Sequence, residues 1–454
     1  MSATATYINT GGELSLAQIE DFQRQFDSQP LFRQAMNAVT STKVNKVALN
    51  RKVASKIDHS YSIQLPENPA TSQKSSGRCW MFAALNTFRS RAQEKMNLEK
   101  GFELSQNYTM FWDKLEKANY FLENILITLD EPVGSRLLDW LLQSPVQDGG
   151  QWDMFVNLIK KYGVVPKSVM PETESSSATG PLNSFLTAKL REYASRLRLS
   201  AEEGTSMEIL RSHKSEFMNE VYRILVVHLG EPPKTFQWQW RDKDQKFHRV
   251  GTITPTDFFK KYIGVVFEDM VCLIHDPRPR HPINSVYTVK FLGNMVGGQP
   301  THYLNTDLET IKKAAIGQLE LKQPVWFGCD VGKNLERDLG VMDLDIYDYQ
   351  SIYGTTMMMN KAERLMYGHS QMTHAMVFTG VDLDRSNKPV KWRVENSWSA
   401  EPGDKGYFQM TDAWFDQYMY EAVVEKSLLS EELLAALSKP AIELEPWDPM
   451  GSLA

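Results

Sequence analysis

Cys79 stands where a polar loop, residues 73–78, gives way to an apolar run, residues 80–85. The run is rich in Ala, Met and Leu, which predicts a buried helix with the cysteine in its first turn. The free N–H groups and the positive dipole at a helix start favour the thiolate, the nucleophilic form of cysteine. Gln73 could supply one donor of an oxyanion hole, with the backbone N–H of Cys79 as the second. The alternative is that Cys79 is a small buried hydrophobic residue, the usual role of a lone cysteine beside Trp and Met.

Hydrolysis of an amide by a thiol needs a base, a group that orients this base, and donors for the oxyanion. His374 and Asn396 can fill the first two roles. The chain has nine histidines, so a histidine alone carries little weight. His374, however, opens an expected strand, and Asn396 opens the sequence Asn-Ser-Trp on a later strand. We therefore expect Cys79, His374 and Asn396 to meet at one groove, with Gln73 beside them.

Two adjacent glycines, Gly149 and Gly150, follow Asp148 and precede a helical pattern over residues 154–162. Paired glycines let the backbone of a ligand approach closely, so this loop is a candidate substrate-binding segment. A plain turn before a helix is the alternative. A second loop, residues 275–281, carries two arginines stiffened by prolines. It could bind an anion, but we interpret it as a surface loop.

The composition indicates a globular protein. The 454 residues are 42% hydrophobic, enough for more than one core, and the net charge of −6 argues against a general nucleic-acid binder. The three cysteines form neither a disulfide framework nor a zinc motif, which indicates a reducing compartment; we expect no metal and no cofactor. The first 12 residues lack the apolar core of a signal peptide, and no apolar stretch is long enough to span a bilayer. We expect a soluble, cytoplasmic protein.

The periodicity of the chain predicts an α+β fold, with helices dominating the first half and short strands the second. Helices are expected from Ser15 (with Gln18 completing a capping box) and over residues 31–39, 105–129, 154–162, 182–229 and 308–319, with a short one after Ser430. A hairpin is expected over 235–250 and strands over 324–329, 373–378, 391–398 and 406–410. Residues 171–181 have the composition of a linker. Prolines at 446 and 449 exclude a regular helix at the end of the chain, where Trp447 is a plausible anchor.

The motifs around the candidate residues resemble those of a known family. Gln73…Cys79-Trp80, His374-Ala375 and Asn396-Ser397-Trp398 look like the Gln, Cys, His and Asn motifs of papain-like cysteine peptidases. Within these, six ordered motifs between residues 73 and 451, among them Gln-Lys-Ser-Ser-Gly-Arg-Cys-Trp and Trp-Asp-Pro-Met-Gly, resemble the bleomycin hydrolase and aminopeptidase C family. One departure is Ser399, where the family usually has Gly.

The resemblance implies a papain-like, two-lobed α+β fold with a helical left lobe and a β-barrel-like right lobe. His374 and Asn396 lie 295 and 317 residues after Cys79, whereas papain-like enzymes have about 130–150. A large helical insertion explains the surplus. We therefore divide the chain into an N-terminal extension (1–70), the left lobe with the nucleophile helix (71–170), a helical and hairpin insertion (171–286), the right lobe with His and Asn (287–425) and a C-terminal arm (426–454).

The resemblance also implies a function: a cysteine aminopeptidase that removes N-terminal residues from peptides. The family forms homohexameric rings in which the C-terminal arm lies in the cleft. On that basis the carboxylate of Ala454 would pair with the α-ammonium of the substrate, and Trp80 and Trp398 would support the site, Trp398 by shielding the bond between His374 and Asn396 from water. Two alternatives stay open: a papain-like endopeptidase whose arm is not in the cleft, and a non-catalytic ring-shaped binding protein, for instance for nucleic acid.

Overall fold

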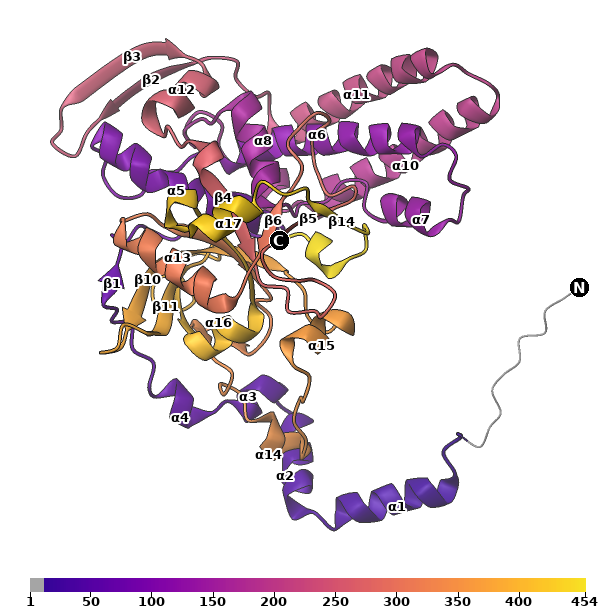
Figure 1. The fold of residues 1–454 in the computed structure, drawn as a ribbon, viewed down its shortest axis with the longest axis vertical. Helices are drawn as coiled ribbons and strands as arrows, with labels where there is room; N and C mark the ends of the chain where they lie inside the picture. The colour runs from indigo at the N-terminus through magenta and orange to yellow at the C-terminus, as the bar shows by residue number, and fades with distance from the viewer. Residues whose placement is uncertain (1–11) are drawn as a thin grey trace, which may run out of the picture. The chain divides into compact units, whose positions relative to one another are not determined.

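The computed structural model describes residues 12–454, which group into two compact units (Figure 1). The smaller unit contains residues 12–57 and 344–358, and the larger unit contains residues 58–343 and 359–454. The segment 344–358 makes its contacts mainly within the smaller unit, with the N-terminal helices.

The smaller unit is made of short helices. They are α1 (Leu16–Asp27), α2 (Pro30–Val39), α3 (Val44–Ala48), α4 (Arg51–Ala54) and α14 (Tyr349–Tyr353). The start of α1 is as predicted: Ser15 is its N-cap, and the side chains of Ser15 and Gln18 cap each other's backbone N–H. This confirms a boundary that a capping box fixes within four residues of sequence.

The first half of the larger unit is mainly helical. Its elements are β1 (Ile63–Gln64), α5 (Cys79–Met96), α6 (Gln106–Ile127), α7 (Arg136–Gln143), α8 (Trp152–Tyr162), α9 (Glu174–Ser177), α10 (Gly180–Glu202), α11 (Met207–Leu229), the hairpin β2 (Phe236–Arg241) and β3 (Phe247–Ile253), and α12 (Pro255–Tyr262). Helices α6, α10 and α11 pack side by side (Figure 1). Of the described helices none is long and apolar enough to cross a membrane.

The second half of the larger unit supplies most of a twelve-stranded sheet, in the order β14-β5-β6-β4-β13-β7-β10-β11-β12-β9-β8 with β1 beside β10. Its strands are β4 (Met270–Ile274), β5 (Ser285–Val289), β6 (Tyr303–Asn305), β7 (Val325–Cys329), β8 (Leu335–Glu336), β9 (Val341–Met342), β10 (His374–Leu383), β11 (Pro389–Glu395), β12 (Tyr407–Thr411), β13 (Met419–Glu425) and β14 (Ile442–Leu444). The helices of this half are α13 (Leu308–Glu320), α15 (Lys361–Met366), α16 (Asp412–Tyr418) and α17 (Glu431–Ala436), with 3-10 turns η1 (Phe267–Asp269), η2 (Lys426–Leu428) and η3 (Pro449–Gly451). The predicted α+β class is confirmed.

Helix α5 connects the two halves of the larger unit. Every residue from Cys79 to Leu85 is buried, and the helix packs on β10 and β7 of the sheet as well as on α6 and α8. The side chain of Trp326 on β7 donates to the carbonyl of Trp80 at 3.0 Å. The start of α5 is therefore held between the helical layer and the sheet, where side chains from both can reach it.

The segment 171–181 is not the linker that its composition predicts. It contains α9 and the first two residues of α10, and the backbone N–H of Ser75 donates to the carbonyl of Ser177 at 2.9 Å. Glu172 pairs with the buried Arg78, the residue before Cys79, through two bonds of 3.2 and 2.7 Å. Small polar residues are typical of linkers, but here they satisfy buried partners next to the Cys79 loop, which only the tertiary contacts reveal.

Candidate active site

The Cys79 thiol lies at the first position of α5 and is 2% exposed. The N-cap residue Arg78 makes no side-chain cap, so the first N–H groups of the helix stay available. The thiol accepts hydrogen bonds from the backbone N–H groups of Trp80 and of Ala375, which follows His374 in β10. The thiol therefore lies against the backbone of β10 at the residue that follows His374.

His374 begins β10, and Asn396 follows the last residue of the neighbouring strand β11. The imidazole Nε2 lies 2.9 Å from Oδ1 of Asn396, and this oxygen also accepts the N–H of Ser397 at 2.7 Å. Because a carbonyl oxygen can only accept, Nε2 carries the proton in the neutral ring. The other nitrogen, Nδ1, is then the one free to take a proton. The ring of Trp398 lies 4.9 Å from that of His374 and covers it on one side.

Burial dominates the electrostatics of this pair. It raises the pKa of the Cys79 thiol to about 11, although the N–H groups of Ala375, Trp80 and Cys79 act in the opposite direction. Burial also lowers the pKa of His374 to about 4, against the effect of its bond to Asn396. The expectation that the helix start alone favours a thiolate is therefore wrong, since desolvation of the charged form outweighs the helix N–H groups. Neither group is stable as a lone ion.

Gln73 is held in place from two sides. Its Oε1 accepts the hydroxyl of Ser397 at 2.6 Å, and its Nε2 donates to the carbonyl of Ser76 at 2.6 Å. The backbone N–H of Gln73 also donates to the carbonyl of Ser397 at 2.8 Å. The side-chain amide has two N–H groups, and the bond to Ser76 uses one of them. Ser397, which the sequence analysis noted only as part of a motif, fixes the orientation of this amide.

The loop 147–150 packs directly on the start of α5. Asp148 accepts the N–H of Gly77 at 2.9 Å, and its carbonyl accepts the indole N–H of Trp80 at 2.7 Å. A side chain at position 150 would collide with the Trp80 ring, at 2.5 Å from its Cβ. Glycine is therefore required at position 150 because the loop approaches the indole so closely.

Two buried lysines on α6 hold this loop. Nζ of Lys114 lies 2.7 Å from the Asp148 carboxylate. Nζ of Lys117 donates to the carbonyls of Gln147 and Gly149, at 3.0 and 2.6 Å, and lies 5.2 Å from the centre of the Trp80 ring. Neither lysine was predicted from the sequence, because nothing in a helical pattern distinguishes a buried lysine from one on a solvated face.

The end of the chain lies against the same loop. The N–H of Gly150 donates to an oxygen of Ala454, and the N–H of Ala454 donates to the carbonyl of Gly150, both at 3.3 Å. A Cβ on Gly149 would meet Ala454 and Leu453 at 2.8 Å each. Ala454 is only 5% exposed. The terminal residue thus pairs with Gly150 as a short antiparallel strand would, and the glycines give it room.

Ser399 adopts a φ of +71°, in the left-handed region. Glycine enters this region at little steric cost, whereas a residue with a Cβ is strained there. Its N–H still bonds the carbonyl of Thr71 at 3.0 Å. Ser399 therefore holds a backbone conformation that is strained for a residue with a Cβ. Within residues 12–454 no group of three or more His, Cys, Asp or Glu side chains is arranged to hold a metal ion.

Comparison with known proteins confirms the resemblance. The model of the peptidase C1-like family matches residues 13–451. Aminopeptidase C of Listeria innocua is 46% identical over 450 residues, covering 97% of this chain and 99% of the relative. Bleomycin hydrolase of Rattus norvegicus is 44% identical over 440 residues, covering 95% and 97%. The crystal structure of PepW from Lactobacillus rhamnosis HN001 superposes with a TM-score of 0.95 at 46% identity, covering 98% of this chain and all of that one. This chain belongs to the peptidase C1-like family and has a papain-like α+β fold.

Proposed function

We propose that the protein is a cysteine aminopeptidase that removes N-terminal residues from peptides. Cys79 is the nucleophile, His374 the base and Asn396 the group that orients it. Gln73 and the N–H of Cys79 form the oxyanion hole. The relatives named aminopeptidase C and bleomycin hydrolase, which align over nearly the whole chain, support the peptidase activity.

The proposed reaction begins with transfer of the Cys79 proton to Nδ1 of His374. Since neither ion is stable alone in this buried site, the two charges form together and stabilise each other. The sulfur then attacks the carbonyl carbon of the first peptide bond, and the oxyanion is stabilised by its two N–H donors. His374 gives its proton to the leaving amine as the C–N bond breaks. Water, deprotonated by His374, hydrolyses the thioester and regenerates the thiol.

The pairing of Ala454 with Gly150 is the observation that carries the exopeptidase assignment. Gly150 lies on the Trp80 ring, next to the nucleophile, and its backbone groups are occupied by the chain's own end. An internal peptide would need these groups for its upstream residues. A substrate that starts at the scissile residue does not, and its α-ammonium can pair with the terminal carboxylate. The endopeptidase alternative requires a free groove at this loop.

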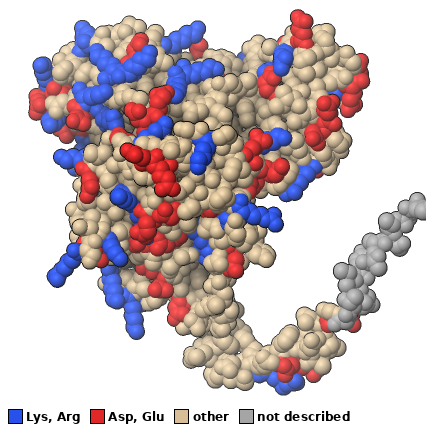
Figure 2. Space-filling view, in the orientation of Figure 1, with Lys and Arg blue, Asp and Glu red and all other residues tan. Residues whose placement is uncertain are grey.

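We further propose a cytoplasmic homohexamer with the five-part organisation 1–70, 71–170, 171–286, 287–425 and 426–454. A hexamer would have six times the 52.0 kDa mass of the chain, which light scattering measures. The ring-shaped nucleic-acid binder is disfavoured because the net charge is −6. On the face of the larger unit drawn in Figure 2, Lys and Arg gather mainly at the upper left, and Asp and Glu lie mostly in the middle and at the right.

The test compares one chromogenic peptide with a free and with an N-acetylated amino terminus. We expect the wild-type enzyme to cleave only the free form and the Cys79→Ala variant to cleave neither. Cys272→Ala, at a buried cysteine on β4, is the matched control and should retain activity. Activity in Cys79→Ala would refute the nucleophile, and equal cleavage of both substrates by the wild type would favour the endopeptidase.

A further inference from the structure

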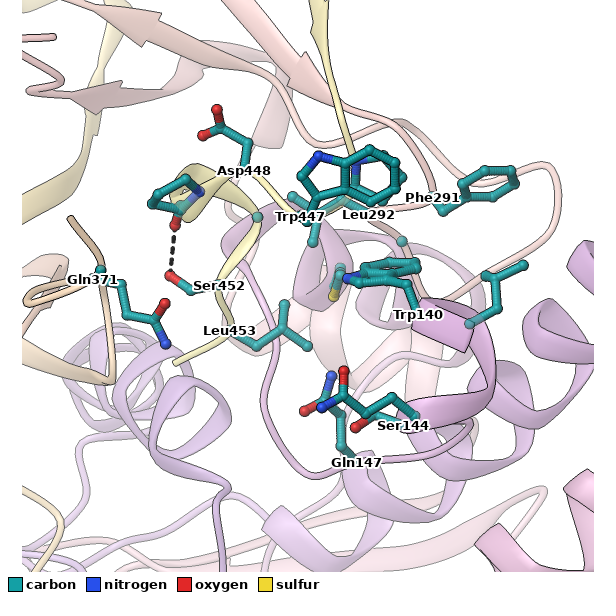
Figure 3. A pocket seen from close by; sticks show the side chains of 18 of the residues that line it. Trp140, Ser144, Gln147, Phe291, Leu292, Gln371, Trp447, Asp448, Ser452 and Leu453 are labelled. Atoms are coloured by element: carbon teal, nitrogen blue, oxygen red, sulfur yellow. Dashed lines mark hydrogen bonds between the residues drawn. The ribbon is translucent and has the colours of Figure 1, made fainter. Parts of the chain in front are cut away.

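We call the last ten residues, 445–454, the arm tip. Its residues 446–449 and 451–453 line a pocket of about 1170 Å³ (Figure 3). The chain enters the arm tip from β14, which pairs in parallel with β5. The guanidinium of Arg136 lies over the ring of Trp447, 3.7 Å from the ring centre. Further along, the side chain of Gln151 donates to the carbonyl of Ser452 at 2.7 Å, and Ala454 then reaches Gly150.

The arm tip also makes an ion pair with the larger part of the protein, between Asp448 and Arg278. Both terminal nitrogens of Arg278 donate to the Asp448 carboxylate, Nη1 to Oδ2 at 3.0 Å and Nη2 to Oδ1 at 2.7 Å. The side chains are 11% and 14% exposed. A bidentate, largely buried pair of this kind is stronger and more directional than a surface contact.

Asp448 also shapes the chain that follows it. Its Oδ1 accepts the N–H of Met450 at 2.9 Å, and its carbonyl accepts the N–H of Gly451 at 2.8 Å. These bonds form the 3-10 turn η3, which redirects the chain before Ser452. The same carboxylate therefore binds Arg278 and sets the direction in which the last three residues leave.

Arg278 belongs to a rigid support, the basic loop 275–281 noted in the sequence. Prolines flank it on both sides. The carboxylate of Asp276 accepts hydrogen bonds from Nε and Nη2 of Arg278, at 2.9 and 2.7 Å. The Asp276 side chain is 1% exposed. His281 contacts both Asp276 and Arg278. Because Nη2 of Arg278 is shared by two carboxylates, loss of Arg278 would leave the carboxylates of Asp276 and Asp448 facing each other.

From this geometry we propose that the Arg278–Asp448 pair is the latch that holds the arm tip at Gly150 and thereby determines specificity for free N-termini. The inference rests on the proposed aminopeptidase function. When the latch opens, Ala454 leaves Gly150, and the N–H and carbonyl of Gly150 become available to the upstream residue of a longer or blocked peptide. Arg278 contacts no reacting atom, so it acts as a specificity-determining residue through the arm.

The experiment uses full-length Arg278→Gln and Asp448→Asn, with Arg278→Lys as the conservative variant. Asp448→Asn retains an oxygen that can cap η3 and loses the charge that Arg278 binds. Arg280→Gln is the matched control, an exposed arginine in the same loop. Two quantities are measured: hydrogen exchange of the amides of residues 451–454, and the ratio of kcat/KM for the acetylated peptide to that for the free one.

Bonds to charged groups of this strength correspond to about tenfold to hundredfold in an equilibrium. We expect Arg278→Gln and Asp448→Asn to accelerate exchange of the arm-tip amides by about that factor and to raise the specificity ratio by at least about tenfold. For both quantities, Arg278→Lys should give values between those of these two variants and the wild type. Arg280→Gln should give wild-type values.

Unchanged exchange and an unchanged ratio in both Arg278→Gln and Asp448→Asn would overturn the latch while leaving the aminopeptidase assignment intact. Faster exchange without a higher ratio would overturn the link between the latch and specificity. If instead the wild type cleaves the acetylated peptide as well as the free one, the proposed function itself fails. In that case the arm tip does not restrict the enzyme to free N-termini, even when its amides exchange slowly. Equal effects of Arg280→Gln would also contradict the proposal, since the arginine paired with Asp448 is Arg278.

Discussion

The buried pair Lys114–Asp148 offers a sharp test of how the active-site loop is held. Lys114 is fully buried, and Asp148 is 9% exposed. Asp148 accepts hydrogen bonds from Lys114, Gly77 and Asn183 and from the hydroxyl of Thr179. Although burial acts to raise it, the Lys114 ammonium and these hydrogen bonds hold the pKa of Asp148 well below its usual range. The pair therefore joins α6, α10 and the loop before Cys79 through one carboxylate.

The two partners should respond unequally to mutation. Asp148→Ala leaves the Lys114 ammonium buried without its counter-charge, and breaking a buried pair in this way costs about 3–5 kcal/mol. Lys114→Met leaves a carboxylate that still accepts three hydrogen bonds, so its cost should lie at the lower end of this range. The double variant Lys114→Met/Asp148→Ala removes both charges, and we expect it to cost less than the sum by about 1–3 kcal/mol.

Thermal unfolding at one fixed scan rate measures the order of these variants, because a chain of this size is not expected to unfold in two states. Lys189→Met is the control: its pair with Glu192 lies on the surface, and such pairs contribute at most about 1 kcal/mol. The expected order of stability is Lys189→Met, then Lys114→Met, then Asp148→Ala, the least stable. The pairing argument would be refuted if the loss of stability in the double variant equalled the sum of the losses in the two single variants.

The same series has a catalytic readout. Without its acceptor at Asp148, the N–H of Gly77 no longer fixes the loop that carries Gln73 and leads into Cys79. We expect kcat to fall in Asp148→Ala at temperatures well below its unfolding, with little change in the Lys189→Met control. A folded Asp148→Ala enzyme with wild-type kcat would mean that this carboxylate stabilises the protein without positioning its site.

Three further predictions concern the site itself. Gln73→Ala should lower kcat by about 10²–10³, as loss of an oxyanion donor does, with far-UV circular dichroism unchanged; a loss below tenfold would contradict its role. The pKa of His374 is depressed to about 4, so its proton-accepting form persists below pH 6.5, and kcat/KM should fall only as the pH drops through about 4; a midpoint near 6.5 would exclude this burial effect. Ser399 has a positive φ, so Ser399→Val should lower the thermal midpoint by the equivalent of about 1–2 kcal/mol, whereas Ser399→Gly should not lower it; equal midpoints would show that the conformation relaxes.

Several features could be predicted from the sequence because they depend on residues close together in the chain. The capping box of Ser15 and Gln18, the hairpin around residues 242–245 and the start of α5 at Cys79 are all as expected. The motifs around Cys79, His374 and Asn396 likewise indicated the family, which the family comparison confirms.

Other expectations failed where long-range packing decides. Residues 171–181 have a linker composition, yet Glu172 closes a buried pair with Arg78. The position of Cys79 at a helix start predicted a thiolate, but burial by the sheet raises its pKa to about 11. Desolvation depends on what packs around a group, and those atoms come from distant parts of the chain.

The sequence by itself determined the candidate reactive groups, the local helix and strand boundaries, and the α+β class, because helix caps, periodicity and motifs act over a few residues. Only the tertiary structure decided that Asn396 fixes the proton on Nε2 of His374, that Lys114 and Lys117 hold the glycine loop, and that Arg278 receives the arm tip. Each of these depends on distance and burial between segments that are far apart in sequence, so no local pattern of residue types specifies them.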